Sequence, residues 1–448
     1  MLWQSGARSY LTNDAEANLK RAIPVVAILA LLCATSLAPA QAPRVADSDI
    51  VDAYEYMLAR WLVLRQEALD FKAGFKWNEV IHRAPGDIAQ AHPNFDVALS
   101  EAWIAVDDTS CTLINLPEIK GRYYTVEIVN GWGEVIDNIN ERTYPDHPFG
   151  TFALCLDKAK VDLPAGAQRV EVAGKKSRIL TTIELGADPA EALALQKQIT
   201  MQATGSPKID DAVVKPDFPD DKLPGVEAFD KTDEILASDA DINKGMADLQ
   251  SKARSVAAAA ADPAQRAHID EVVQSQAIPA FLAAIAKMSP TMNGWVHPRI
   301  TGNYGNDYLT RSIVDFTGIW ANGPREAVYF DGTGFDGSQT YTQTYPKDAL
   351  PAVKARVFWS VIAVDTRNYR VIANPLSRYS FNNQSGLKRN ADGSLTLVFA
   401  PKLPDGVPQS NWLPTPAGQD YNLTYRFYGP ARDVVEGRYY PPFLSIRP

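Results

Sequence analysis

The sequence has little of what most often carries metal binding and nucleophilic catalysis. Its 448 residues include three cysteines and five histidines. The histidines are scattered without the spacing of a zinc site: His82, His92, His147, His268 and His297. The G-x-S-x-G, H-E-x-x-H and Walker patterns are absent, which removes the usual sequence signatures of α/β-hydrolases, zinc proteases and P-loop enzymes. We therefore expect neither a metal nor a cofactor.

A basic excess is also missing. The chain has 44 Lys and Arg residues against 53 Asp and Glu residues, which gives a formal net charge of −9. Nucleic-acid backbones are bound by clustered cationic side chains, so we expect no nucleic-acid partner. The 46% hydrophobic and 22% charged fractions are ordinary for a globular protein, and the length allows two or three domains.

The apolar run near the N-terminus, residues 22–37, is too short for a comfortable membrane span. A basic pair at 20–21 precedes it, and the small residues of Ala-Pro-Ala at 38–40 follow it. This is the pattern of a secretory signal cleaved before Gln41, with an uncleaved anchor as the alternative. We expect residues 1–40 to be a signal peptide, and the mature chain to be periplasmic or secreted without membrane contact.

Two cysteines, Cys111 and Cys155, remain in the mature chain. An oxidising compartment permits a disulfide, which would stabilise the fold by about 4 kcal/mol according to the loop-entropy model. Both lie in strand-like segments, where two buried free thiols are the equal alternative. Neither has polar or basic neighbours in the sequence that would activate a thiolate, so a catalytic role is not expected.

Hydrophobic periodicity divides the mature chain into β-rich and helical parts. Residues 47–70 have the spacing of a helix, and from residue 94 to 185 short segments alternate with a period of two. Residues 228–288 are helical by composition, after a proline-rich linker. From about residue 295 the pattern is again that of strands, interrupted by one helix at 306–321.

We therefore predict a mainly β fold with helical insertions (α+β). Two antiparallel β-sandwich or jelly-roll-like units are expected, at 41–205 and 291–448, joined by a linker and helical segment at 206–290. The alternation is clearest in two segments. In GRYYTVEIVN, one side carries Tyr124, Val126 and Ile128, and the other carries Tyr123, Thr125 and Glu127. In YNLTYRFY, the apolar side carries Tyr421, Leu423, Tyr425 and Phe427.

Residues 332–337 match the G-x-G-x-x-G dinucleotide pattern literally. That pattern binds a pyrophosphate only when a helix follows, because the helix N-terminus meets the phosphates. Here the strand-like SQTYTQTY follows instead. We interpret the glycines as a hairpin loop.

Five residues are candidates for a binding site. Asp96 follows Pro93-Asn94 and precedes an alternating segment, so Asn94 and Asp96 lie where a loop enters a sheet. A carboxylate there can bind a ligand hydroxyl or act as acid or base, or it can tie down its own loop. Arg122 and Arg378 can clamp a carboxylate or pair internally. Trp412, in a turn context, can stack on a sugar face or line a core.

Several motifs resemble paired families of bacterial exported proteins. The segments TGNYGNDYLTRS (301–312) and ANPLSRYS (373–380) are similar to the domain of unknown function numbered 1214. HPNFDVALSEAW (92–103) and LPEIKGRYYTVEIVNGWGEV (116–135) resemble the domain of unknown function numbered 1254. The resemblance implies two β-sandwich units with helical insertions, and it implies no activity.

One motif of the resemblance is incomplete. The first-half family pattern is Asn-x-Asp-Thr-Leu-Tyr-Ser, and this sequence matches it at Asn94, Asp96 and Ser100. Residues 97–99, Val-Ala-Leu, replace its Thr, Leu and Tyr. If the two hydroxyls serve chemistry in relatives, this chain has lost that chemistry.

Our leading hypothesis is binding of a small molecule or envelope glycan near Asn94, Asp96 and Arg122, with Arg378 and Trp412 as candidates in the second unit. The alternative is a metal-independent hydrolase or lyase, with Asp96 as acid or base and Arg122 polarising an oxyanion. A third hypothesis is a structural protein that forms a homo-oligomer through a flat apolar face.

Overall fold

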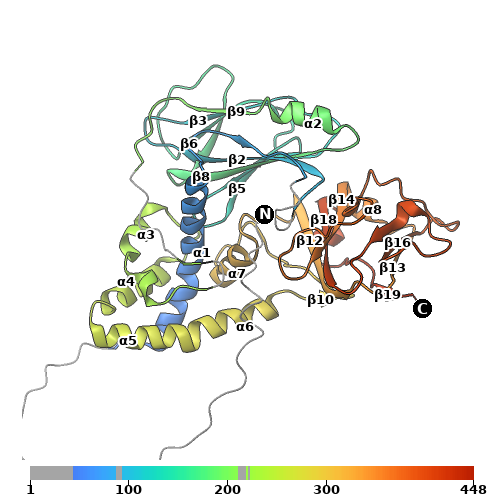
Figure 1. Cartoon of the computed structure of the whole chain (residues 1–448). Coiled ribbons are helices and arrows are strands. Elements are labelled where there is room, and N and C mark those ends of the chain that lie inside the picture. Colours follow the sequence, from blue (N-terminus) through green and yellow to red (C-terminus); the bar gives the residue numbers. More distant parts are fainter. Residues whose placement is uncertain (1–43, 87–92, 210–217, 220–221, 448) are drawn as a thin grey trace, which may run out of the picture.

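The computed structural model describes residues 44–86, 93–209, 218–219 and 222–447. Within them, 19 strands form four open sheets, arranged as two β units with most of the helices beside them (Figure 1). The predicted α+β fold with two sandwich-like units is confirmed. The proposed signal peptide lies outside the described residues. Among the helices that are described, none is long and apolar enough to cross a membrane.

The first β unit consists of two sheets. Its inner sheet has the order β1 (Ile81–His82), β2 (Val97–Ala105), β8 (Lys176–Glu184), β4 (Tyr124–Val129) and β5 (Val135–Ile139). Its outer sheet has the order β7 (Gln168–Val172), β6 (Gly150–Leu156), β3 (Thr112–Leu116) and β9 (Thr200–Ala203). The predicted alternation of β4 holds: Val126 and Ile128 are buried between the sheets, against Phe152 and Leu154.

The second β unit repeats this plan. Its inner sheet has the order β10 (Thr291–Met292), β11 (Trp295–Val296), β12 (Ala327–Asp336), β18 (Asp420–Pro430), β14 (Ala355–Asp365) and β15 (Ser380–Asn382). Its outer sheet has the order β17 (Trp412–Pro414), β16 (Leu395–Ala400), β13 (Tyr341–Tyr345) and β19 (Ser445–Ile446). Tyr425 and Phe427 of β18 pack between the sheets with Leu397 and Phe399, as their alternation predicts. Pairing is antiparallel except for β6–β7 and β16–β17.

The glycine-rich segment at 332–337 is not the predicted hairpin loop. Gly332 and Gly334 lie within β12, where the register against β18 shifts between Gly332 and Phe335. Gly334 has φ +75°, a conformation that glycine adopts without strain, so the segment forms a bulge. The element that follows is β13, a strand, and the rejection of a dinucleotide site agrees with this geometry.

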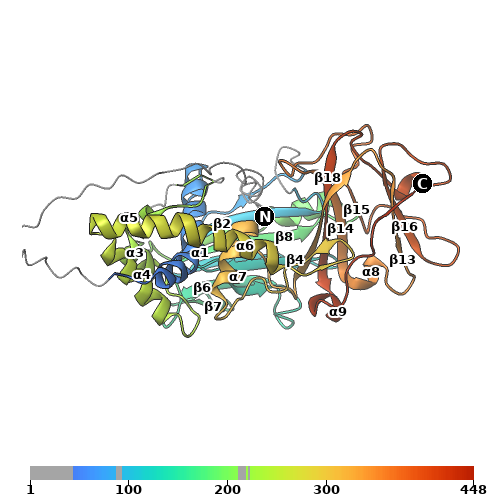
Figure 2. The ribbon, with the colours of Figure 1, turned by 90° about the horizontal axis from the view of Figure 1, so that it is seen from below.

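The described helices lie partly in a layer beside the two units and partly on the sheets themselves (Figure 1). They are α1 (Asp47–Lys72), α2 (Pro189–Gln196), α3 (Thr232–Ser238), α4 (Ala247–Ala259), α5 (Pro263–Val272), α6 (Ile278–Met288), α7 (Tyr308–Gly318), α8 (Pro351–Lys354) and α9 (Arg432–Val435), with a π-helical turn at Val273–Ala277. Figure 2 shows α3 to α5 and the second unit at opposite ends of the molecule, with α7 between them.

Helix α1 is the shared centre of this arrangement. Its buried Leu58 and Trp61 pack with residues of α4, α5 and α7. Two polar contacts then fix its position. Arg60 donates from Nη1 to the carbonyl oxygen of Gly131, 2.7 Å away in the β4–β5 turn. Ser312 of α7 donates to the carbonyl oxygen of Glu55, 257 residues earlier in the chain, at 2.6 Å.

Candidate functional site

A cavity lies where the inner sheets of the two units face each other. Because side chains alternate along a strand, each inner sheet has one face toward its own core and one toward the other unit. The cavity encloses about 100 Å³. The first unit lines it with Val97, Leu99, Tyr123, Thr125, Glu127, Leu180 and Thr182. The second unit and its connections line it with Trp320, Asn322, Ala327, Tyr329, Arg426 and Tyr428.

Glu127 is the most unusual group in this cavity. It is 5% exposed, and its Oε1 atom has no hydrogen-bond partner among the described residues. Burial raises the pKa of its carboxyl well above the usual range, and the nearby Glu326 raises it further. Burial therefore disfavours the charged form of Glu127 unless a cationic partner is present.

Aromatic side chains of both units also line the cavity. The Asn94 amide donates from Nδ2 to the Tyr428 hydroxyl at 2.7 Å, so a loop of the first unit holds this ring from the other unit. Tyr428 also stacks on Phe358, with ring centroids 4.1 Å apart. Burial raises the pKa of Tyr123 and of Tyr329, which keeps both hydroxyls neutral.

Charged pairs next to the cavity join the two units. Arg142 donates from Nη2 to Glu326 Oε2 at 2.5 Å, and its guanidinium lies over the Tyr123 ring, 4.9 Å from the centroid. Arg426 donates from Nη2 to the carbonyl oxygen of Pro93 at 3.0 Å. These contacts fix the positions of the two cavity walls, one from each unit, relative to each other.

The structure places Asn94 and Asp96 at this contact between the units. Asn94 lines the cavity, and its Oδ1 accepts from the backbone N–H of Asp96 at 3.1 Å, so it also ties its own loop. Asp96 lines a neighbouring space of about 120 Å³ and accepts from Asn382 Nδ2 at 2.7 Å. Burial raises the pKa of Asp96, and the hydrogen bond from Asn382 acts in the opposite direction.

Arg122 is engaged in holding the backbone. Its Nη1 donates to the carbonyl oxygens of Glu184 and Leu185, both at 3.1 Å, and of Asp188 at 3.3 Å. Its Nη2 pairs with Glu191 in the first turn of α2. Arg122 therefore joins the end of β8 to the start of α2 and does not line either space.

Arg378 and Trp412 lie together in the second unit, away from the lining of the cavity. Arg378 donates from Nη1 to the carbonyl oxygen of Trp412 at 3.0 Å, and Trp412 donates from Nε1 to the carbonyl oxygen of Ala400 at 2.8 Å. Both side chains connect backbone segments within that unit. The five sequence candidates thus form three groups, of which only Asn94 and Asp96 lie at the contact between the units.

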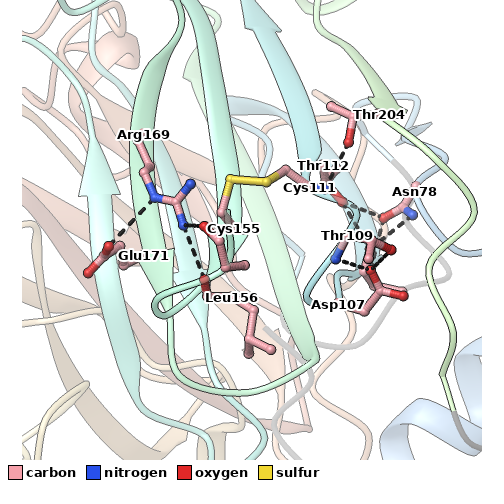
Figure 3. Close-up of a disulfide and its surroundings, with 12 residues drawn as sticks. Asn78, Asp107, Thr109, Cys111, Thr112, Cys155, Leu156, Arg169, Glu171 and Thr204 are labelled. Carbon is pink, nitrogen blue, oxygen red and sulfur yellow. Dashed lines mark hydrogen bonds and ion pairs between the residues drawn. A yellow bond between two sulfur atoms is a disulfide. The ribbon is translucent and has the colours of Figure 1, made fainter. Parts of the chain in front are cut away.

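The two cysteines are bonded in the structure (Figure 3). Cys111 and Cys155 have an S–S distance of 2.05 Å and join the start of β3 to β6 within the outer sheet of the first unit. The Cys111 backbone N–H donates to Thr204 Oγ1 at 2.9 Å. The sulfurs lie in a buried apolar cluster with Leu113 and Ala153, which is the surrounding of a structural disulfide.

Sequence analysis missed the cavity-lining residues Glu127, Tyr329 and Tyr428. All six residues of β4 are buried, including those on the face opposite the core of the unit. The sequence did contain an indication of this. The second face of the strand carries Tyr123 and Glu127 together, and an aromatic ring beside a carboxylate suggests that another part of the protein covers that face. Within the described ranges, no cluster of three or more His, Cys, Asp or Glu side chains is placed to hold a metal ion.

Two solved structures are similar to this chain, and the first of them has the same overall fold. The VPA0106 protein from Vibrio parahaemolyticus is 19% identical with a TM-score of 0.67, and the match covers 90% of this chain and 100% of that one. A putative uncharacterized protein from Burkholderia cenocepacia is 13% identical with a TM-score of 0.43, covering 90% and 94%. No curated protein matches the sequence.

Both β units match families defined by sequence. The first match includes all of β2 to β9, and the second begins just before β12 and ends within α9. Neither family description gives an activity. Residues 77–203 match the model of the family described as Protein of unknown function (DUF1254), and residues 325–432 match the model of the family described as Protein of unknown function (DUF1214).

Proposed function

We propose that this chain is an exported protein that binds a small polar molecule in the cavity between its two β units. One observation carries the proposal: Glu127 is a buried carboxyl at the cavity wall, and its Oε1 has no hydrogen-bond partner in the described part of the chain. An unsatisfied buried oxygen of this kind costs free energy, about 1–3 kcal/mol. A ligand that bonds to it recovers that cost.

The size of the cavity favours a small molecule over a glycan. Pockets for drug-sized ligands measure about 300–1,000 Å³. The cavity here, about 100 Å³, accommodates a molecule of a few heavy atoms. A glycan chain would need an open groove instead.

The alternative, a hydrolase or lyase that uses Asp96 and Arg122, has less support. An oxyanion needs donors that point to a shared space. The Nη1 group of Arg122 already donates to three backbone carbonyls, and Arg122 does not line the space beside Asp96. Binding without turnover is therefore the function we propose.

The test uses mature protein, residues 41–448, incubated with envelope and metabolite extracts and analysed by mass spectrometry. We expect one species to be bound in a one-to-one ratio. Thr182→Phe, which fills the cavity, should abolish the binding, while the matched control Thr151→Phe in the outer sheet should not. Consumption of a compound beyond the molar amount of protein would instead establish an enzyme. An untouched extract would refute the proposal.

Export is supported by two features of the chain. The first 40 residues have the pattern of a signal peptide, and Cys111 and Cys155 form a disulfide, which persists mainly in oxidising compartments. We expect full-length protein expressed in a bacterium to be recovered from the periplasm or medium with Gln41 as its N-terminal residue. Protein that stays in the cytoplasm with residues 1–40 attached would contradict this.

A further inference from the structure

We infer that the ligand is a small organic cation, an amine or quaternary ammonium compound, held by the Glu127 carboxylate against the aromatic wall of the cavity. This inference rests on the proposed binding function and narrows it to one class of ligand. Three properties of the described residues support it: the charge balance around the cavity, the kind of side chains in its wall and its volume.

The charge balance singles out Glu127. Arg83 at the rim pairs with Glu101, with Nε and Oε2 2.5 Å apart. Glu326 pairs with Arg142 across the contact between the units. The buried Arg426 guanidinium also lines the cavity, and its Nη2 donates to the carbonyl oxygen of Pro93. Glu127 has no cationic side chain within ion-pair distance among the described residues that surround it, and its Oε1 receives no hydrogen bond from them. An added cation would be the first ion-pair partner of this carboxyl among the described residues and would favour its ionised form.

The wall opposite Glu127 has the chemistry that cations prefer. Tyr329, Tyr428 and Trp320 line the cavity, and the negative face of an aromatic ring attracts an ammonium group. One face of the Tyr123 ring is covered by the Arg142 guanidinium, 4.9 Å from the centroid, and one face of the Tyr428 ring is covered by Phe358. We therefore assign the ring contacts of the ligand first to Tyr329 and Trp320. A carboxylate together with several rings is how proteins hold quaternary ammonium groups.

Anions and neutral molecules fit these features of the cavity less well than cations do. An anion would lie beside the oxygen atoms of Glu127. The two guanidinium groups of the lining are engaged, Arg83 with Glu101 and Arg426 with the carbonyl oxygen of Pro93. A neutral molecule could accept a hydrogen bond from protonated Glu127, but it would gain little from the aromatic faces. The cavity volume, about 100 Å³, suits a compact ammonium compound.

The experiment compares matched probes by isothermal titration calorimetry on the mature chain. Choline is titrated against its uncharged carbon analogue 3,3-dimethyl-1-butanol, ethanolamine against ethylene glycol, and acetate serves as the anion. We expect the two cations to bind roughly 10- to 100-fold more tightly than their neutral counterparts, as a charge-assisted contact implies. Equal binding of cation and neutral analogue, or stronger binding of acetate, would overturn the inference.

Two variants assign the preference to the residues named. Glu127→Gln keeps the shape of the side chain and removes its negative charge. This variant should bind each cation no more tightly than its neutral analogue. Tyr329→Leu should reduce the preference for choline several-fold by removing one ring. Asp239→Asn is the matched control, because Asp239 is also a buried carboxyl but does not line this cavity. Thermal midpoints show whether each variant is folded.

The outcomes separate the two proposals. If Glu127→Gln keeps the full preference for cations, the assignment to Glu127 is wrong. If only neutral probes bind, and Thr182→Phe blocks them, the cavity binds ligands but the cation class is wrong. If no probe binds to the wild type, the cation inference fails, and the extract experiment decides separately whether the cavity binds anything.

Discussion

Asp239 provides the sharpest test of the electrostatics in this fold. Its side chain is 4% exposed and lies between the β4–β5 turn and the end of α3. Its Oδ2 accepts from the backbone N–H of Gly131 at 2.7 Å, while its Oδ1 has no hydrogen-bond partner in the described residues. Burial raises its pKa from 3.8 to about 6, although Arg60 and the Gly131 N–H act in the opposite direction.

This shift has a definite sign in the free energy of unfolding. The folded chain holds the Asp239 proton more tightly than the unfolded chain does. The resulting stability is fully present below about pH 4 and is lost as the pH rises through about 6. A shift of roughly two units corresponds to about 3 kcal/mol. We therefore expect Asp239→Asn, which cannot ionise, to gain about 3 kcal/mol relative to the wild type between pH 3.5 and pH 7.

The assay is urea unfolding of both proteins at several pH values. Other titrating groups are common to both, so the difference in free energy of unfolding reports Asp239 alone to a first approximation. At the lowest pH Asp239 is protonated, so the difference in free energy of unfolding there measures the effect of replacing the carboxylic acid by an amide. A difference that moves the other way, with the wild type gaining stability as the pH rises, would show that Arg60 holds Asp239 as a stable anion and would refute the reasoning.

Two further predictions concern the disulfide and the contact between the units. Replacing both Cys111 and Cys155 by Ala opens a loop with a sequence separation of 44 and should lower the free energy of unfolding by about 4 kcal/mol, measured in urea; an unchanged midpoint would contradict this. Phe358→Ala removes a ring that is 1% exposed and stacked on Tyr428, so it should cost about 3–5 kcal/mol and speed proteolysis between the units. Phe443→Ala, at 63% exposure, is the control and should change stability by less than about 0.5 kcal/mol.

The sequence was sufficient to predict the cores of the two units. Apolar side chains recur at every second residue in β4 and β18, and this pattern predicts a buried position for Val126, Ile128, Tyr425 and Phe427. The structure confirms that all four are buried. Such assignments succeed because one face of a strand must be apolar wherever a sandwich closes over it. The helix predicted at 306–321 is also present, as α7.

The site could not be predicted in the same way. Its walls come from the second faces of two sheets, and the pairing of those faces depends on how the units dock, which periodicity does not encode. Arg122 illustrates the problem: its sequence context suggested a ligand clamp, yet its donors are used by the carbonyls at the end of β8. Glu127 was assigned to a half-buried strand, and it became a site only because the second unit covers it.

The contact between α1 and α7 has a consequence for how the chain is made. Ser312 reaches the carbonyl oxygen of Glu55 across 257 residues of sequence. At a synthesis rate of about 5–20 residues per second, α1 leaves the ribosome roughly 10 to 50 s before its partner exists. During that interval Leu58 and Trp61 have no complete partner surface, although both are fully buried in the finished fold. The core around α1 therefore cannot be completed until residue 318 has been made.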